Sequence, residues 1–155
     1  MSAHRAYVGL GANLGDPAAQ LARALGLIEE LGTVSRRSSL YRTRAWGKTD
    51  QPDFINAVVL LETELAPAEL LAALRTIETR LGRTSAPRWA PRKMDLDLLT
   101  YDECTIVLPG LRVPHPRLRE RAFVLVPLAE IDSRYEAARA ALAPRDLAGV
   151  VKVAD

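Results

Sequence analysis

Apolar and polar positions follow one another along this chain in patterns that predict a mixed fold of strands and helices. Three segments have the compact apolar runs of short strands: residues 6–12, 54–65 and 94–101. Leucine and isoleucine recur every three or four positions after Pro17 and again after Pro67, which predicts two amphipathic helices. Proline is favoured in the first turn of a helix and glycine just beyond the last, so these helices should end near Gly32 and Gly82.

Weaker patterns extend this outline. Residues 33–42 have the polar alternation of an exposed strand, and residues 106–113 are expected to pair with residues 94–101 after a turn. Residues 121–131 predict a short helix around Pro127, and the tail that follows is expected to be helical.

The main elements come in the order strand, helix, strand, strand, helix, strand, which is the order of two split βαβ units. This order predicts an α+β fold with a ferredoxin-like βαββαβ core. We expect a mainly antiparallel sheet, helices packed on one face and extra C-terminal elements. A length of 155 residues fits one domain, residues 1–155.

The composition of the chain limits which binding partners and which cellular location fit this protein. The chain has 21 Lys and Arg against 19 Asp and Glu, and a net charge of +2 does not by itself indicate a nucleic-acid partner. No run approaches the roughly 18 apolar residues of a membrane span, and the first residues lack the apolar core of a secretory signal. The single cysteine, Cys104, allows no disulfide within the chain. These features indicate a soluble cytoplasmic protein.

Asp95 and Asp97 are candidate ligands for a metal ion. They flank Leu96 on a predicted strand, where residues two apart point to the same face. Two like charges held together need compensation, and Mg²⁺ can supply it because it takes carboxylate oxygens and shares its shell with substrate phosphates. The alternative is an exposed edge strand with two solvated acids, since short Asp-x-Asp triplets are common.

The loop at residues 83–93 (RTSAPRWAPRK) leads directly into Asp95 and is rich in arginine, including Arg83 and Arg92. A guanidinium fork matches phosphate oxygens in two-point contacts, so this loop and the carboxylates together suit a polyphosphate. A loop of this length is also a candidate lid over substrate. A solvated basic loop is the alternative, and Trp89 within it either docks on the core or covers a ligand.

Phe54 and Asn56 suit the binding of a flat heterocycle, because they lie on one face of a predicted strand. The Asn56 amide can read the edge of a ring while the aromatic ring of Phe54 stacks on its face. An Asn at a strand bulge beside a core Phe is the alternative. His115 lies between two prolines and is either a surface residue or a phosphate donor and proton relay.

Six motifs follow one another along most of the chain: GLGANLGDP, SSLYRTRAWG, QPDFINAV, the LGR that closes the second helix, RWAPRKMDLDLL and VPHPRLRERAFVLVPLAEI. In order and spacing they resemble the 6-hydroxymethyl-7,8-dihydropterin pyrophosphokinase family. RWAPRKMDLDLL is the most specific of the six, and the C-terminal end of the chain contributes least.

The resemblance implies a single catalytic domain that transfers the β,γ-pyrophosphate of ATP to the hydroxymethyl oxygen of the reduced pterin. The products are AMP and the pterin diphosphate, on the way to folate. It implies two Mg²⁺ ions held by Asp95 and Asp97, with ATP as co-substrate. The catalytic residues that it implies are Arg83, Arg92 and Asp97.

The resemblance also implies two sets of binding residues. The ATP-binding residues would be Glu78, Trp89, Arg92, Leu98, His115 and Arg121. The pterin-binding residues would be Thr43, Trp46, Phe54, Asn56, Asp95 and Phe123. The two phenylalanines would sandwich the heterocycle. The partners implied are these small molecules alone, for a monomer that binds neither nucleic acid nor membranes.

Some positions depart from the family pattern. Phe54 stands where some members carry Tyr, so stacking is kept and a hydroxyl is lost. Trp46 stands where a smaller aliphatic residue can occur, which alters one wall of the pterin pocket. Arg75 stands where a nucleotide-contacting Gln is often found, and Thr84 stands near the place of a further loop arginine.

Other functions fit parts of the sequence. Ferredoxin-like sheets with basic loops can bind RNA, although this chain lacks the aromatic-rich central strand that such modules use for stacking. A different metal-dependent phosphotransferase or hydrolase could use the same carboxylates. A small-ligand regulatory domain would leave the arginines and the Asp pair unexplained.

Overall fold

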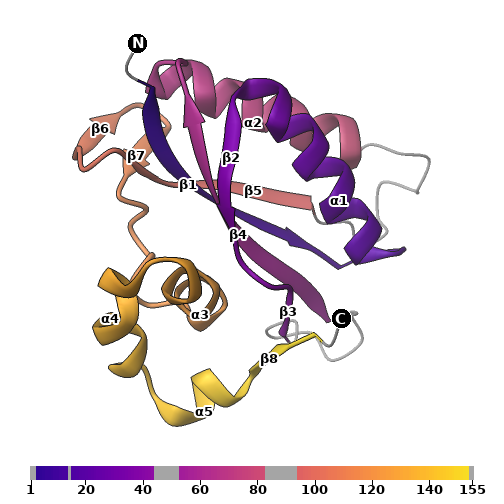
Figure 1. The fold of residues 1–155 in the computed structure, drawn as a ribbon, viewed down its shortest axis with the longest axis vertical. Helices are drawn as coiled ribbons and strands as arrows, with labels where there is room; N and C mark the ends of the chain where they lie inside the picture. The colour runs from indigo at the N-terminus through magenta and orange to yellow at the C-terminus, as the bar shows by residue number, and fades with distance from the viewer. Residues whose placement is uncertain (1–2, 14, 44–52, 83–93, 154–155) are drawn as a thin grey trace.

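The computed structural model describes residues 3–13, 15–43, 53–82 and 94–153, in which one antiparallel sheet has helices on both faces (Figure 1). The strands lie side by side in the order β5 (Met94–Tyr101), β1 (His4–Ala12), β4 (Phe54–Thr63), β3 (Tyr41–Thr43) and β8 (Val150–Lys152). β2 (Thr33–Arg37) also pairs with β4; it contacts residues 59–62, whereas β3 contacts residues 54–56. All of these pairings are antiparallel, and the ferredoxin-like core predicted from the sequence is confirmed.

Two helices, α1 (Pro17–Ile28) and α2 (Pro67–Gly82), cover one face of this sheet (Figure 1). The side chain of Asp16 accepts a hydrogen bond from the Ala19 N–H at 3.2 Å, and a proline follows it at the first helical position, as the sequence predicts. α2 ends at Gly82 as predicted, whereas α1 gives way to a 3₁₀ turn (Glu29–Leu31) before Gly32.

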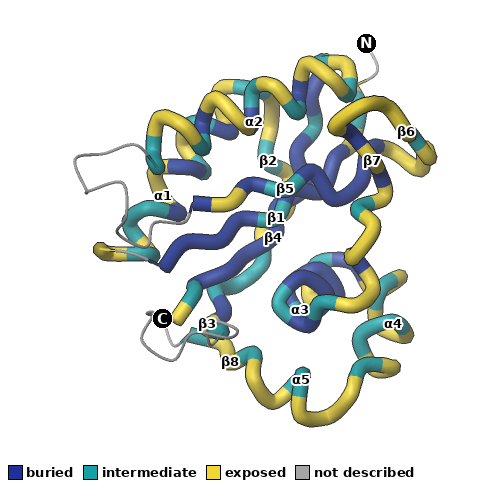
Figure 2. The backbone as a smooth tube through the Cα atoms, turned by 180° about the vertical axis from the view of Figure 1, so that it is seen from behind, coloured by how far each residue is buried: buried dark blue, intermediate teal, exposed yellow. Residues whose placement is uncertain are grey.

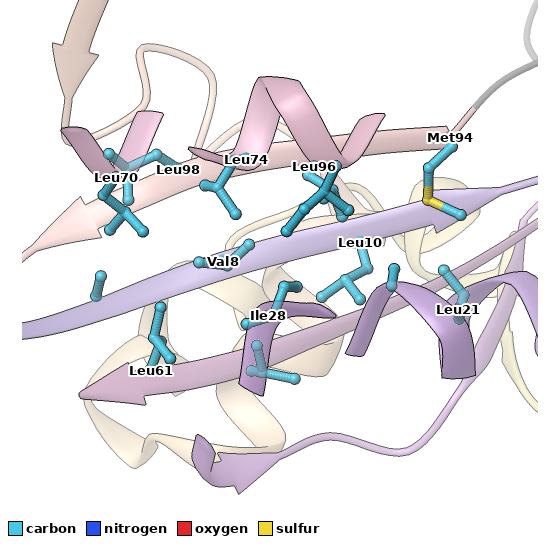
Figure 3. Packing of buried hydrophobic residues seen from close by; sticks show 14 of the residues in the cluster. Val8, Leu10, Leu21, Ile28, Leu61, Leu70, Leu74, Met94, Leu96 and Leu98 are labelled. Atoms are coloured by element: carbon cyan, nitrogen blue, oxygen red, sulfur yellow. The ribbon is translucent and has the colours of Figure 1, made fainter. Parts of the chain in front are cut away.

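The main core lies between these helices and the sheet (Figure 3). β1 and β5 alternate so that every second side chain is apolar and faces α1 and α2, as in a half-buried strand. The residues that fill this layer include Val8 and Leu10 of β1, Leu96 and Leu98 of β5, Leu21 and Ile28 of α1, and Leu70 and Leu74 of α2. Their burial fixes which side of β5 is left for polar residues.

The opposite face of the sheet carries α3 (Ala122–Ile131), which belongs to the extra C-terminal elements (Figure 1). A second core forms there, where Leu125 and Leu128 of α3 pack with Tyr7, Val58 and Leu99 of the strands. β1, β4 and β5 are buried along much of their length, whereas α4 (Glu136–Ala140) and α5 (Pro144–Ala148) have no buried residue (Figure 2).

Two expectations were wrong. Residues 106–113 do not extend the main sheet beside β5; β6 (Ile106–Leu108) and β7 (Leu111–Val113) pair with each other as a separate two-stranded sheet. Gly110, at φ +75°, makes the tight turn that returns the chain on itself. The tail is not entirely helical, because β8 follows α5 and pairs with the free edge of β3.

Residues 33–42, expected to form one strand, are divided into β2 and the start of β3. The break falls near Ser39, whose backbone N–H and hydroxyl both donate to the Glu130 carboxylate on α3, at 2.9 and 2.8 Å. None of the helices in the described ranges combines the length and the apolar character needed to cross a membrane.

Candidate functional site

The candidate site begins at β5, where two acidic side chains alternate with core leucines. Leu96 and Leu98 are buried toward α1 and α2, whereas Asp95 is exposed and Asp97 is half-buried. Along β1, Asp95 is the strand partner of Gly11 and Asp97 is the partner of Gly9. On the face that carries the two carboxylates, the neighbouring part of β1 therefore has no side chains, because Leu10 points to the opposite face.

Glu78 brings a third carboxylate to this segment from α2. It accepts a hydrogen bond from the Leu96 N–H at 2.8 Å. Burial raises the pKa of Glu78 above its ordinary value, and the negative charges of Asp95 and Asp97 raise it further, against the lowering effect of the Leu96 N–H. Glu78 thus lies close enough to the Asp pair for the three carboxylates to repel one another.

The donor set suits a hard cation that shares its shell with a ligand. Within the described ranges, no group of three or more His, Cys, Asp or Glu side chains is arranged to hold a metal ion. Mg²⁺ commonly takes only one or two protein carboxylates and completes its shell with water and substrate phosphates. Asp95 and Asp97 offer that number of carboxylates, so the residues present fit Mg²⁺ with a phosphate ligand.

A cavity of about 430 Å³ opens beside Asp97. Its lining includes Arg75 and Glu78 of α2, Leu98 of β5, Arg112 of β7, and His115. This cavity is thus lined by three of the residues that the family resemblance assigns to ATP: Glu78, Leu98 and His115.

His115 lines this cavity, and Arg121 lies close enough to His115 to affect its pKa. Burial lowers the pKa of His115, the cations of Arg121 and Arg117 lower it further, and Asp97 opposes them. The lowered pKa favours the neutral imidazole at pH 7. Its Nδ1 accepts a hydrogen bond from the Arg117 N–H at 3.1 Å, which leaves the Nε2–H to donate. Arg121 is not part of the cavity lining; its guanidinium lies 5.5 Å from the centre of the Phe123 ring.

A second group of predicted residues meets at the ends of β3 and β4. Asn56 is buried, with Gly11 of β1 and Tyr41 of β3 as its strand partners, and its Nδ2 donates to Thr43 Oγ1. Phe54 is half-buried and is the strand partner of Thr43. The β1–β4 register is continuous through Asn56, so the alternative of an Asn at a strand bulge is wrong.

The two groups are joined across β1. Gly11 is paired with Asn56 on one side and with Asp95 on the other, so a single residue of backbone separates the amide from the carboxylate pair. Phe123 lies on α3, half-buried against the second core. The remaining predicted site residues, Trp46, Arg83, Trp89 and Arg92, lie outside the described residues.

Sequence reasoning gave no role to several residues of this region. Val107 and Leu108 of β6 are 63% and 51% exposed and line the cavity, with Arg112 on the neighbouring strand. The sequence shows two apolar residues before the Pro109–Gly110 turn, but only the hairpin structure shows that they line a cavity. Gly11 belongs to the GLGANLGDP motif, but its position between Asn56 and Asp95 depends on the strand register, which the sequence does not show.

Comparisons with known proteins agree on one family. The family model for 7,8-dihydro-6-hydroxymethylpterin-pyrophosphokinase (HPPK) matches residues 7–133. The chain is 47% identical over 158 aligned residues to a 2-amino-4-hydroxy-6-hydroxymethyldihydropteridine pyrophosphokinase of Methylorubrum extorquens, covering 96% of this chain and 98% of that protein. It is 45% identical to the protein of the same name in Bacillus subtilis, covering 84% of this chain and 80% of that protein.

Among solved structures, the chain is similar to a Plasmodium falciparum HPPK-DHPS crystallised with pterin and p-hydroxybenzoate. The TM-score is 0.71 at 16% identity, over 90% of this chain and 43% of that one. This chain thus corresponds to less than half of the Plasmodium protein. At such low identity the likeness concerns the fold.

Proposed function

The chain belongs to the 7,8-dihydro-6-hydroxymethylpterin-pyrophosphokinase family, and we propose that it transfers pyrophosphate from ATP to the hydroxymethyl group of 6-hydroxymethyl-7,8-dihydropterin. The products are AMP and the pterin diphosphate, in folate biosynthesis. The observation that carries the proposal is the strand register around Gly11. It sets an amide suited to a heterocycle beside two carboxylates suited to a metal–phosphate complex, with the cavity next to them.

Asp95 and Asp97 would hold the metal, and we propose two Mg²⁺ ions. When bound, Mg²⁺ neutralises phosphate oxygens and lowers the pKa of a coordinated hydroxyl group. The role of the protein carboxylates is to bind these cations beside the pterin pocket. β5 suits that role because its buried leucines and the hydrogen bond from Leu96 to Glu78 fix the strand that carries both acids.

The two reactants would lie on either side of the carboxylates. Glu78, Leu98 and His115 would contact ATP from the cavity, with Arg121 beside them. Asn56 and Thr43 would hydrogen-bond the edge of the pterin. The other residues proposed for the pterin are Phe54, Asp95 and Phe123, and Trp46 from outside the described residues.

The arginines of residues 83–93 complete the proposal. Phosphoryl transfer depends on positioned cations that stabilise charge as it develops. We assign Arg83 and Arg92 to that role, beside the catalytic Asp97, and Trp89 to the closing of the nucleotide site. All three lie outside the described residues, so their assignment rests on the sequence motif. We further propose a monomeric, single catalytic domain over residues 1–155, which works in the cytoplasm.

An assay of product identity tests the proposed function. The purified protein is incubated with Mg-ATP, with and without 6-hydroxymethyl-7,8-dihydropterin, and the nucleotides are separated by chromatography. We expect AMP to form only when the pterin is present. Release of ADP or of inorganic phosphate would instead identify another phosphotransferase or a hydrolase, and no pterin-dependent AMP would refute the proposal.

A further inference from the structure

β1 presents an unusual surface to the side of the sheet that carries α3. The residues on this side are Tyr7, which is covered by the second core, and then Gly9 and Gly11. The two glycines are the strand partners of Asp97 and Asp95. On this face, β1 therefore presents only backbone atoms between β4 and β5, at the point where the two groups of site residues meet.

The space above Gly11 is occupied by the amide of Asn56. A Cβ atom built on Gly11 would lie 2.8 Å from Asn56 Oδ1 and 4.0 Å from Phe54 Cδ1. The first distance is too short for a real contact, so the amide would have to move. Asn56 is only 6% exposed, and its Nδ2 is already engaged by Thr43 Oγ1, so the amide cannot turn away without losing that hydrogen bond.

Gly9 differs from Gly11 although it faces the same side. A Cβ atom on Gly9 would lie 3.5 Å from Leu99 Cδ1, which is an ordinary van der Waals contact with an apolar side chain. Of these two glycines, only Gly11 therefore requires a missing side chain, because its neighbour is a polar group with a fixed partner.

We propose that Gly11 is a positioning residue for the pterin, which acts by holding the Asn56 amide in its binding orientation. Its bare Cα lets Oδ1 lie above the β1 backbone, on the side toward Asp95, while Thr43 holds Nδ2. The amide is thereby set to read the ring edge before the ligand arrives, which lowers the cost of ordering it on binding. This inference rests on the proposed function, because the pterin is the ligand it concerns.

The test compares Gly11→Ala with Gly9→Ala. The Kd for 6-hydroxymethyl-7,8-dihydropterin is measured by calorimetry with a nonhydrolysable ATP analogue present, and KM and kcat are measured in the AMP assay. For Gly11→Ala we expect the pterin Kd and KM to rise about tenfold, the loss of roughly one well-placed hydrogen bond. The kcat and the KM for ATP should stay within about twofold, whereas Gly9→Ala should leave the pterin Kd within about twofold.

A double-mutant cycle tells an action through Asn56 from a collision with the pterin itself. In an Asn56→Ala background, adding Gly11→Ala should raise the pterin Kd no further. If it still raises it about tenfold, or if Gly9→Ala weakens pterin binding as much as Gly11→Ala, the positioning role is overturned. A wild-type protein that forms no AMP would instead remove the proposed function and leave this comparison without its ligand.

Side-chain NMR provides a readout that needs no ligand. In the ligand-free protein, the Asn56 Nδ2 resonances should shift in Gly11→Ala and in Thr43→Val, and should remain in place in Gly9→Ala. Thermal unfolding of the same samples shows that each variant is folded at the temperature of the measurement. Unmoved Asn56 resonances in folded Gly11→Ala would overturn the inference even where the pterin Kd had changed.

Discussion

The carboxylate of Glu78 on α2 accepts a hydrogen bond at 2.8 Å from the backbone N–H of Leu96 on β5. β5 is the outer strand of the sheet, and an outer strand leaves alternate N–H groups without a partner strand. Glu78 satisfies one such group midway between Asp95 and Asp97. The helix thus holds in place the part of the strand that carries both candidate metal ligands.

Replacing Glu78 with Ala should destabilise the protein more than replacing it with Gln. Ala leaves the Leu96 N–H without its acceptor, which costs about 1–2 kcal/mol of the free energy of unfolding. Gln keeps an acceptor oxygen and removes a charge that Asp95 and Asp97 repel, so its loss should be smaller. Urea unfolding at pH 7 measures both values, and equal losses would mean that this hydrogen bond contributes little to stability.

Asp97→Ala should impair catalysis far more than pterin binding. Asp97 is assigned to the metal beside the reacting phosphates, while Asn56, Thr43 and Phe54 hold the ring. We expect the rate of AMP formation to fall by about 100-fold or more, the scale of losing a major charge-stabilising group. The pterin Kd should change by no more than about threefold.

The matched control for this variant is Glu64→Ala, which removes an exposed carboxylate just beyond the C-terminal end of β4. Its rate should equal that of the wild type. Near wild-type turnover by Asp97→Ala would contradict the assignment of Asp97, and an equal loss in the control would point to a general effect of net charge.

Phe54→Ala should weaken pterin binding without affecting the nucleotide. Phe54 is half-buried beside Asn56, and loss of a stacked ring together with its apolar contact corresponds to about a tenfold rise in Kd. Phe54→Tyr keeps the ring and should bind as the wild type does. Calorimetry with each ligand measures both effects, and a rise in the Kd for the ATP analogue in Phe54→Ala would contradict the separation of the two pockets.

The elements that the sequence predicts well are those whose pattern is long enough to show its period. α1 and α2 repeat apolar residues every three or four positions, and β5 alternates apolar and acidic residues. β1 and β4 are instead nearly continuous apolar runs, which their strand-like length identifies. β8 and the β6–β7 hairpin have three residues per strand, too few to show a period. What pairs with such short strands is decided by tertiary packing.

Some features of the candidate site can likewise be predicted from the sequence, and others depend on how the strands pair. Asp95 and Asp97 are visible in the sequence because their spacing alone places them on one face of a strand. The relationship of Gly11 to Asn56 is not visible, because it joins positions 45 residues apart (56 minus 11) through the β1–β4 register. The exposed Val107 and Leu108 likewise acquire a role only when the hairpin places them at the cavity.

A buried carboxylate at the C-terminal end of α3 makes the stability of this fold dependent on pH. Asp132 has a side chain that is 7% exposed; it accepts a hydrogen bond from the Tyr7 hydroxyl at 2.9 Å and pairs with Arg134 at 2.8 Å. Hydrogen bonding to Arg134, more than any other contact, lowers the pKa of Asp132 from 3.8 to about 2. Because this pKa is lower in the folded state than in the unfolded state, the stabilisation is present above about pH 4 and is lost as the pH falls toward 2.

Asp132→Asn should therefore differ from the wild type most at neutral pH. The depression of the pKa corresponds to about 2 kcal/mol, so the wild type should be more stable by roughly that amount at pH 6, and the gap should close as the pH approaches 2. Urea unfolding across this range measures the gap. Glu103→Gln is the control, because Glu103 is 85% exposed where it meets Arg134, and such surface pairs contribute little. A gap for Asp132→Asn that stayed constant with pH would show that shape and packing, and not the ionised carboxylate, make residue 132 stabilising.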